Sequence, residues 1–185
     1  MDIKFNVDIP GYATYEECIT ICNIIDNVDF YSVLEVGSYT GRLTWSLCQT
    51  FIDKQITALD TWDGGSYIDR IGSSYWNSTE RDQRYFGKTN TVEMFNVFNK
   101  HDNLKTVQTD FYNYKTAHDV IILSADAEEI IWENLIDHAL SLGPKLIIGR
   151  HAHHHRIKIN EVLESYEIER YDPHGVYIVK HKKVI

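Results

Sequence analysis

VLEVGSYTGR, residues 33–42, is the stretch that decides the predicted fold of this chain. Residues 32–36 form a short run rich in strand-forming residues, and Gly37 stops it, which predicts a buried strand that ends in a turn. Residues 42–51 then read as a helix. A strand, a glycine-bearing turn and a helix in this order form the first unit of an α/β sheet.

The alternation of strands and helices continues along the chain. Further strands are predicted at residues 55–59, 104–108, 119–123 and 145–148, and further helices at residues 14–25, 91–100, 128–142 and 157–163. Thr14 is the expected N-cap of the first helix, with Glu17 as its capping-box partner. Residues 167–171 and 176–179 flank Asp-Pro-His-Gly and predict a hairpin. We therefore expect an α/β, Rossmann-like, doubly wound sheet, mostly parallel, with an antiparallel C-terminal strand.

The 185 residues fit one domain, because a chain of this length is within the usual domain size and no linker or repeat divides it. Within this domain, residues 1–185, we expect an N-terminal helical segment over residues 1–30. Residues 61–87 are polar and aromatic, and they exceed the length of an ordinary connection. Their aromatic and arginine side chains suit either a lid over a small ligand or a contact with a second subunit in a homo-oligomer.

Composition narrows the classes of partner. The net charge is -9, and an acidic balance disfavours binding to a nucleic-acid backbone, which relies on clustered Lys and Arg. No apolar run approaches the roughly 20 residues that a membrane span needs. Three cysteines do not suggest a secreted disulfide framework. These features predict a cytoplasmic protein that binds neither nucleic acid nor a membrane.

The ligand site is expected at the carboxyl ends of the strands, where open α/β sheets bind their ligands. Gly37 and Gly41 permit a tight turn there, and Asp60 ends the second strand, where its carboxylate can accept hydrogen bonds from ribose hydroxyls. A dinucleotide fingerprint would need G-x-G-x-x-G. Tyr39 and Arg42 stand at the second and third glycine positions of that pattern, so the chain carries E-x-G-x-x-x-G instead.

At these residues the chain resembles a known family. VLEVGSYTGRLTWSL resembles motif I of the class I S-adenosylmethionine (SAM) methyltransferases, in the branch of small-molecule O-methyltransferases and cephalosporin hydroxylase-like proteins. The resemblance extends, in order, to DIPGYATYEECITICNII, ITALDTWDGG, MFNVFNKHDNLKTVQTDFYNY, HDVIILSADAEE and PKLIIGRHA. It covers roughly residues 8–180 and implies the class I methyltransferase fold.

The resemblance also implies a SAM pocket. Glu35 and the turn at residues 37–41 would hold the methionine end of SAM. Asp60 would accept from the ribose hydroxyls, while Thr61 and Trp62 would flank the adenosine. The implied cofactor-binding residues are Glu35, Gly37, Ser38, Tyr39, Thr40, Gly41, Asp60, Thr61, Trp62, Ser124 and, near the adenine, Asp110 and Phe111. For each of them a turn glycine or a capping carboxylate is the alternative interpretation.

The chain departs from the metal-dependent members of this family. Those members carry an Asp at the positions where this chain has Ser124 and His151. Because Mg²⁺ prefers oxygen ligands, usually carboxylates, we expect no Mg²⁺ and no metal ligands of the family's kind.

Two residues are candidates for a catalytic base, His151 first and Asp126 second. His151 belongs to the run RHAHHHR, residues 150–156, and imidazole titrates near neutral pH, which suits removal of a hydroxyl proton. The histidines of this run have two other interpretations, a solvated loop at the pocket rim and a transition-metal site.

The resemblance implies a SAM-dependent enzyme that methylates a hydroxyl of a small acceptor such as a sugar, a polyketide or a phenol. The missing carboxylates favour an alternative, a catalytically degenerate relative that binds SAM or a nucleotide and has a binding or regulatory role. A third class is an enzyme that uses NAD or a nucleotide sugar, since a fold does not determine a function.

Overall fold

The computed structural model describes residues 1–62, 91–124, 129–150, 164–171 and 175–182. Its strands are β1 (Ser32–Val36), β2 (Gln55–Asp60), β3 (Leu104–Gln108), β4 (Val120–Leu123), β5 (Leu146–Gly149), β6 (Tyr166–Tyr171) and β7 (Val176–Lys182). Its helices are α1 (Tyr15–Asp26), α2 (Arg42–Thr50), α5 (Thr91–Phe98), α6 (Glu129–Ser141) and the 3₁₀ turn η1 (Phe111–Asn113). Each of these strands and α-helices overlaps a predicted one. The predicted helix at residues 157–163 and most of the predicted lid or interface segment, residues 63–87, lie outside the described residues.

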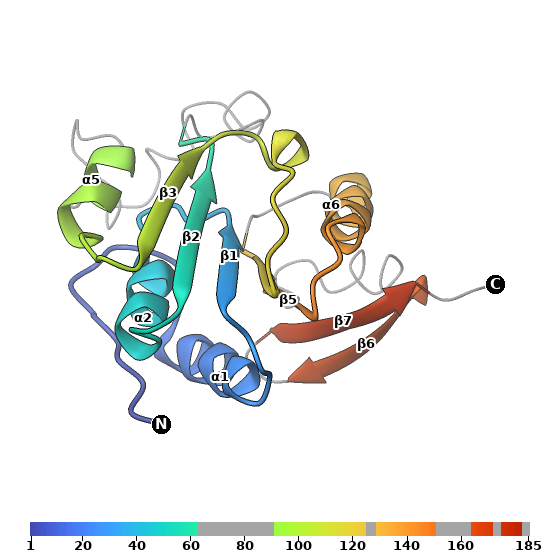
Figure 1. Ribbon diagram of the computed structural model, residues 1–185, viewed down its shortest axis with the longest axis horizontal. Coiled ribbons are helices and arrows are strands. Elements are labelled where there is room, and N and C mark those ends of the chain that lie inside the picture. The colour runs from blue at the N-terminus through green and yellow to red at the C-terminus, as the bar shows by residue number, and fades with distance from the viewer. Residues whose placement is uncertain (63–90, 125–128, 151–163, 172–174, 183–185) are drawn as a thin grey trace.

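One mixed sheet organises the chain. Its seven strands have the order β3-β2-β1-β4-β5-β7-β6 (Figure 1). The pairs among β1 to β5 are parallel, whereas β7 runs antiparallel to both β5 and β6. The predicted, mostly parallel sheet with an antiparallel C-terminal strand is therefore confirmed, as is the terminal hairpin.

The strand order reverses beside β1, because the chain builds β2 and β3 on one side of it and returns to build β4 and β5 on the other. Val36 at the end of β1 is in register with Leu59 of β2 and with Leu123 of β4. The carboxyl ends of these strands are therefore level. Doubly wound sheets bind their ligands outside such a reversal.

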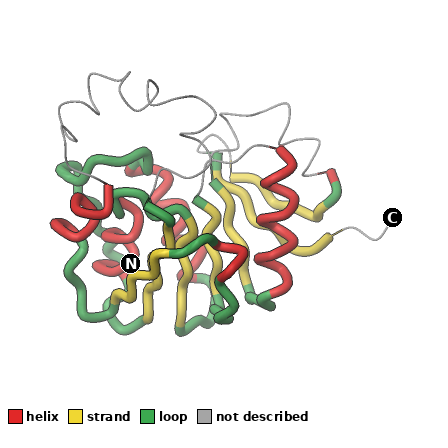
Figure 2. The backbone as a smooth tube through the Cα atoms, turned by 90° about the horizontal axis from the view of Figure 1, so that it is seen from above, coloured by secondary structure: helices red, strands yellow, loops and turns green. Residues whose placement is uncertain are grey.

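Helices cover both faces of the sheet, as Figure 2 shows. On one face, α1 and α2 bury Cys18, Ile21, Ile25, Leu43 and Leu47 against Val33, Ile122 and Ile148 of the strands. On the other face, α6 buries Trp132, Leu135 and Ile136 against Leu34, Ile121 and Ile147. No helix in the described part of the chain is long and apolar enough to cross a membrane.

The N-terminal helix α1 begins as predicted. The Thr14 hydroxyl accepts from the Glu17 N–H at 3.1 Å, and the Glu17 carboxylate accepts from the Thr14 N–H at 2.8 Å, which completes the capping box. Cys18 and Cys22 are buried one turn apart, and burial raises the pKa of Cys18 to about 11 and that of Cys22 to about 12. Both thiols are therefore protonated at neutral pH and pack as small apolar side chains.

The opposite, amino end of the sheet is held by Asp119. Its carboxylate accepts from the backbone N–H groups of Tyr31 and Ser32 at 2.8 and 3.1 Å, and it lies 3.0 Å from Lys145 Nζ. β4 begins at Val120, one residue later than predicted. These contacts, led by the Tyr31 N–H and Lys145, lower the pKa of Asp119 to about 2.

We expect Asp119→Asn to lower the free energy of unfolding by about 1 kcal/mol at pH 7, because solvent screens much of the charge interaction with the exposed Lys145. A carboxylate with a depressed pKa stabilises the folded state above its unfolded pKa, and that stability is lost as the pH falls from about 4 toward 2. The difference between wild type and variant, measured by urea unfolding, should therefore shrink over this range. Asp53→Asn at a side chain that is 74% exposed serves as the control. A difference independent of pH would contradict this account.

Candidate functional site

The carboxyl ends of β1, β4 and β5 border a pocket. Its volume is about 310 Å³, which includes space that is open to solvent. The turn after β1 contributes residues 37–40, the N-terminal segment contributes residues 11–13, and Glu35, Ser124 and Arg150 come from the three strand ends. The pocket therefore lies at the reversal of strand order, where the sequence predicts the ligand site.

The turn after β1 has a left-handed backbone and is anchored on β2. Gly37 and Gly41 both have φ of 83°, a conformation that favours glycine. Tyr39 has φ of 54°, and its N–H donates to the Asp60 carboxylate at 2.8 Å. The Gly37 N–H donates to the Leu59 carbonyl at 2.8 Å. The end of β2 thus determines the shape of the turn after β1.

Gly41 has a packing reason to be glycine as well. A Cβ atom at this position would lie 2.2 Å from Asn99 Nδ2 and 2.7 Å from Cδ2 of Phe95. Asn99 Nδ2 also donates to the Thr40 carbonyl at 3.3 Å. The end of α5 therefore covers the start of α2, and contact of Gly41 with a cofactor remains a prediction.

The N-terminal segment is fastened to this turn by hydrogen bonds that the sequence did not reveal. Arg42 Nε donates to the Ile9 carbonyl at 2.6 Å, and Arg42 Nη1 donates to the Ala13 carbonyl at 3.0 Å. The Thr40 hydroxyl donates to the Pro10 carbonyl. One wall of the pocket is therefore built by residues that precede α1.

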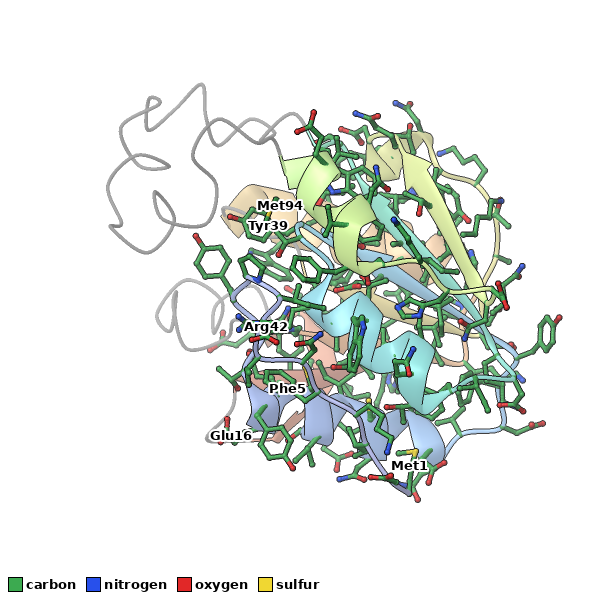
Figure 3. The ribbon with its side chains drawn as sticks, turned by 90° about the vertical axis from the view of Figure 1, so that its left-hand side faces the viewer. Met1, Phe5, Glu16, Tyr39, Arg42 and Met94 are labelled. Carbon is green, nitrogen blue, oxygen red and sulfur yellow. The ribbon has the colours of Figure 1, made fainter. Side chains whose placement is uncertain are left out.

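Aromatic rings border the same wall. The rings of Tyr12 and Tyr39 lie 5.4 Å apart between centroids at an interplanar angle of 30°. The Arg42 guanidinium lies 5.8 Å from the Phe5 ring centroid, and Figure 3 shows Arg42 between Tyr39 and Phe5. Because Tyr12 is 55% exposed, the two tyrosines lie at the outer edge of the pocket.

Glu35 is a buried carboxylate at the inner end of the pocket. Its side chain accepts a hydrogen bond from the Thr44 hydroxyl of α2, and Glu35 is only 1% exposed. Burial raises the pKa of Glu35 to about 7, although Thr44 and the charge of Arg150 oppose this shift. Carboxylates with raised pKa values are concentrated at functional sites.

Asp60 connects two turns. Its oxygens accept from the Tyr39 N–H at 2.8 Å and from the Trp62 N–H at 2.9 Å. The Trp62 indole donates to the Tyr39 carbonyl at 2.6 Å, and its ring is buried against Phe95 at 5.0 Å between centroids. The Thr61 carbonyl accepts from Gln108 Nε2 at 2.8 Å. The Trp62 side chain therefore packs beneath the turn, and the predicted place of Thr61 and Trp62 beside an adenosine remains a prediction.

Asp110 and Phe111 lie beyond the end of β3 and do not line the pocket. The Asp110 carboxylate accepts from the Tyr112 N–H at 2.8 Å and so caps η1, which is the alternative role expected for a carboxylate. Phe111 is 5% exposed and packs edge-to-face against His138 of α6, with ring centroids 4.7 Å apart. Their place beside an adenine remains a prediction.

Arg150 directly follows β5, and the sequence predicted no contact for it with α1. Its Nη2 lies 3.1 Å from Glu17 Oε2, and both side chains are at least 95% buried, at 5% and 4% exposure. Among the described residues, Arg150 Nε and the Ser124 hydroxyl have no hydrogen-bond partner. Buried polar groups are nearly always hydrogen-bonded, so these atoms of the pocket lining are suited to a ligand.

Both predicted catalytic residues, Asp126 and His151, lie outside the described residues, as do His153, His154 and His155 of the same run. Within the described ranges, no group of three or more His, Cys, Asp or Glu side chains could hold a metal ion. The pocket thus brings together Glu35, residues 37–40 and Ser124 of the predicted set, and it adds Arg150.

Solved structures match this arrangement, although no protein-family model and no curated protein matches the chain. A ribosomal protein L11 methylase from Lactobacillus delbrueckii subsp. bulgaricus aligns with a TM-score of 0.61 at 15% identity, over 98% of this chain and 86% of that one. A proposed caffeoyl-CoA O-methyltransferase from Staphylococcus aureus aligns with a TM-score of 0.57 at 10% identity, over 95% and 87%. PaMTH1, a methyltransferase from Podospora anserina whose structure contains S-adenosylhomocysteine (SAH), aligns with a TM-score of 0.57 at 12% identity, over 93% of this chain and 80% of that one. The chain has a class I methyltransferase-like fold.

This methyltransferase-like fold confirms the predicted α/β, doubly wound, mostly parallel sheet with an antiparallel strand near the C-terminus. At identities of 10–15% the likeness concerns the fold alone. The O-methyltransferase branch and the roles of single residues stay predictions that rest on the site.

We expect Glu35→Gln to stabilise the methyltransferase-like fold at high pH. A carboxyl group whose pKa is raised on folding contributes stability below its unfolded pKa of about 4.5, and that stability is lost as the pH rises through 7. Glutamine does not titrate, so the variant should match wild type near pH 4 and exceed it by up to about 3 kcal/mol at pH 8. Urea unfolding at both pH values measures the difference. A variant less stable than wild type at pH 8 would show that the Glu35 charge is compensated in the fold.

Proposed function

We propose that this chain binds SAM at the pocket and transfers its methyl group to a hydroxyl of a small acceptor. The observation that carries the proposal is the buried Glu35 carboxylate, placed in a pocket at the strand-order reversal of a class I methyltransferase-like fold. An ionised carboxylate removed from water destabilises the fold unless a positive group compensates it. SAM carries two such groups, an ammonium and a sulfonium.

The residues of the pocket fit such a ligand. Glu35 would bind the ammonium, and the left-handed turn at residues 37–41 lets the ligand approach the backbone closely. Asp60 does not itself line the pocket. It is half-buried at the end of β2 beside the turn, where the N–H groups of Tyr39 and Trp62 orient its carboxylate. Each carboxylate oxygen has more than one acceptor site, so Asp60 can also accept from two ribose hydroxyls.

SAM supplies the methyl group, and the protein would contribute position and a base. The acceptor oxygen has to lie in line with the methyl group, and holding it there removes much of the entropic barrier. His151 and Asp126 are the proposed bases, because each follows a strand that ends at the pocket. Sugars, polyketides and phenols are the proposed acceptors, and no Mg²⁺ is required because Ser124 offers no carboxylate.

A second candidate is a protein that binds SAM without methyl transfer. It is favoured by Ser124, an uncharged side chain at the end of β4 where metal-dependent relatives carry a carboxylate. Transfer of a radiolabelled methyl group to any member of a panel of hydroxylated acceptors would exclude this second candidate.

Calorimetric titration of SAM and S-adenosylhomocysteine (SAH) tests the pocket. We expect micromolar binding by wild type and a loss of at least about tenfold in Asp60→Ala, because hydrogen bonds to an ionised group are the stronger class. Asp53→Ala, at an exposed carboxylate that follows the C-terminal end of α2, is the matched control and should bind as wild type does. If wild type binds neither ligand at millimolar concentration, the proposed function is wrong.

The affinity for SAH should rise by about tenfold between pH 6 and pH 8. Glu35 has a pKa of about 7 and binds an ammonium only when it is ionised, so proton loss on this interval strengthens binding. In Glu35→Gln the affinity should be weaker and nearly independent of pH over the same interval. An equal pH dependence in variant and wild type would assign the titration to another group.

A further inference from the structure

Three neighbouring strand ends aim polar side chains at one side of the sheet. Val33, Ile122 and Ile148 belong to the core beneath α1 and α2. Side chains two residues apart along a strand share a face, so Glu35, Ser124 and Arg150 lie on the same side at the three carboxyl ends. All three line the pocket, and their exposed fractions are only 1%, 6% and 4%.

Arg150 has donor capacity that the described residues do not use. Its Nη2 is paired with Glu17 at 3.1 Å, whereas its Nε has no partner and is buried. A buried guanidinium is expected to have its N–H groups satisfied, because leaving a charged donor without a partner in the interior is costly. The unpaired Nε–H therefore points to a missing acceptor.

Ser124 supplies a second unused donor beside it. Its backbone N–H donates to the Val36 carbonyl at 2.8 Å, which fixes the residue at the end of β4. Its hydroxyl is buried, lines the same pocket and has no partner in the described part of the chain. A hydroxyl and a guanidinium that face one cavity are a suitable donor pair for an anionic oxygen.

The described residues that line the pocket carry charges of both signs. Glu35 is the acid, and Arg42 and Arg150 are the bases. Arg42 donates to the carbonyls of Ile9 and Ala13, and Arg150 pairs with Glu17, which does not line the pocket. The pocket therefore holds an acceptor, Glu35, together with the donors of Arg150 and Ser124. A group that carries one positive and one negative charge complements this arrangement better than a single cation or anion does.

We propose that Arg150 and Ser124 bind a carboxylate of the ligand, and that together with Glu35 they select a ligand that ends in an α-amino acid group. This inference rests on the proposed function, because the ligand would be SAM bound through its aminoacyl end. It distinguishes SAM and SAH from NAD, nucleotide sugars and simple nucleosides, none of which carries a free α-amino acid group.

Calorimetry with two probes tests the inference. SAH carries the carboxylate, whereas 5′-methylthioadenosine keeps the nucleoside and the thioether but lacks the amino acid group. Arg150→Met alone would leave Glu17 as an unpaired buried charge, so it is combined with Glu17→Gln, which retains a capping-box residue. Glu17→Gln alone is the matched control, since it leaves Arg150 in place and the Gln carbonyl oxygen can accept the Arg150 Nη2–H in place of the carboxylate.

We expect the Arg150→Met, Glu17→Gln variant to bind SAH at least about tenfold more weakly than Glu17→Gln alone does. These two variants should bind methylthioadenosine with the same affinity. Ser124→Ala should bind SAH about threefold or more weakly than wild type does, and it should bind methylthioadenosine with wild-type affinity. Ser46→Ala, which removes a buried hydroxyl outside the pocket lining, should bind both probes as wild type does.

The contrary outcomes are distinct. If both probes weaken together, or if SAH binding is unchanged, Arg150 and Ser124 do not bind the carboxylate, although the proposed function survives. If wild type binds neither probe, the inference and the proposed function are both wrong. If wild type binds the two probes with equal affinity, the pocket does not select an amino acid group.

Discussion

The site depends on one buried contact, the ion pair between Glu17 and Arg150 at 3.1 Å. The same Glu17 oxygen accepts the Thr14 N–H, so a single carboxylate both caps α1 and binds the residue that follows β5. Removing two charges from water costs several kcal/mol each unless they are paired in good geometry. The pair thereby lets a guanidinium reach the interior beside Glu35, where its charge opposes the rise in the pKa of that carboxyl. It also joins the N-terminal helix to the sheet at the pocket.

The polar groups at the two ends of the sheet differ in how fully they are hydrogen-bonded or paired. At the amino end, Asp119 accepts from two backbone N–H groups and pairs with Lys145, so its charge stabilises the fold. At the carboxyl end, Glu35 stays buried at a cost, and Ser124 and Arg150 keep donors without partners among the described residues. Structural carboxylates are expected to be satisfied, whereas sites that bind ligands keep unused polar atoms. The donors that Ser124 and Arg150 leave without partners line the pocket, which is where we propose that the ligand binds.

The turn after β1, which we propose binds the ligand, is held in its shape by contacts within the protein. Tyr39 keeps a left-handed conformation because Asp60 accepts its N–H and Trp62 donates to its carbonyl. Phe95 covers Gly41 from α5, where a side chain would not fit. A loop organised by such contacts loses less conformational entropy on binding. Residues that resemble ligand contacts in the sequence are thus also the residues that preform the turn.

The sequence by itself determined the order of strands and helices, the capping box of α1, and the acids near the ends of β1 and β2. These features depend on local patterns, namely hydrophobic periodicity, glycines at the ends of elements, and capping residues. The resemblance of the sequence motifs to class I methyltransferases also implied that Glu35, the turn and Ser124 would share one site, and all of them line the pocket. Only the tertiary structure decided that Arg150 binds Glu17, which is 133 residues away in the chain, that residues before α1 form a pocket wall, and that Trp62 and Phe111 pack inward. Contacts between distant side chains depend on packing across elements, and no local pattern encodes that packing.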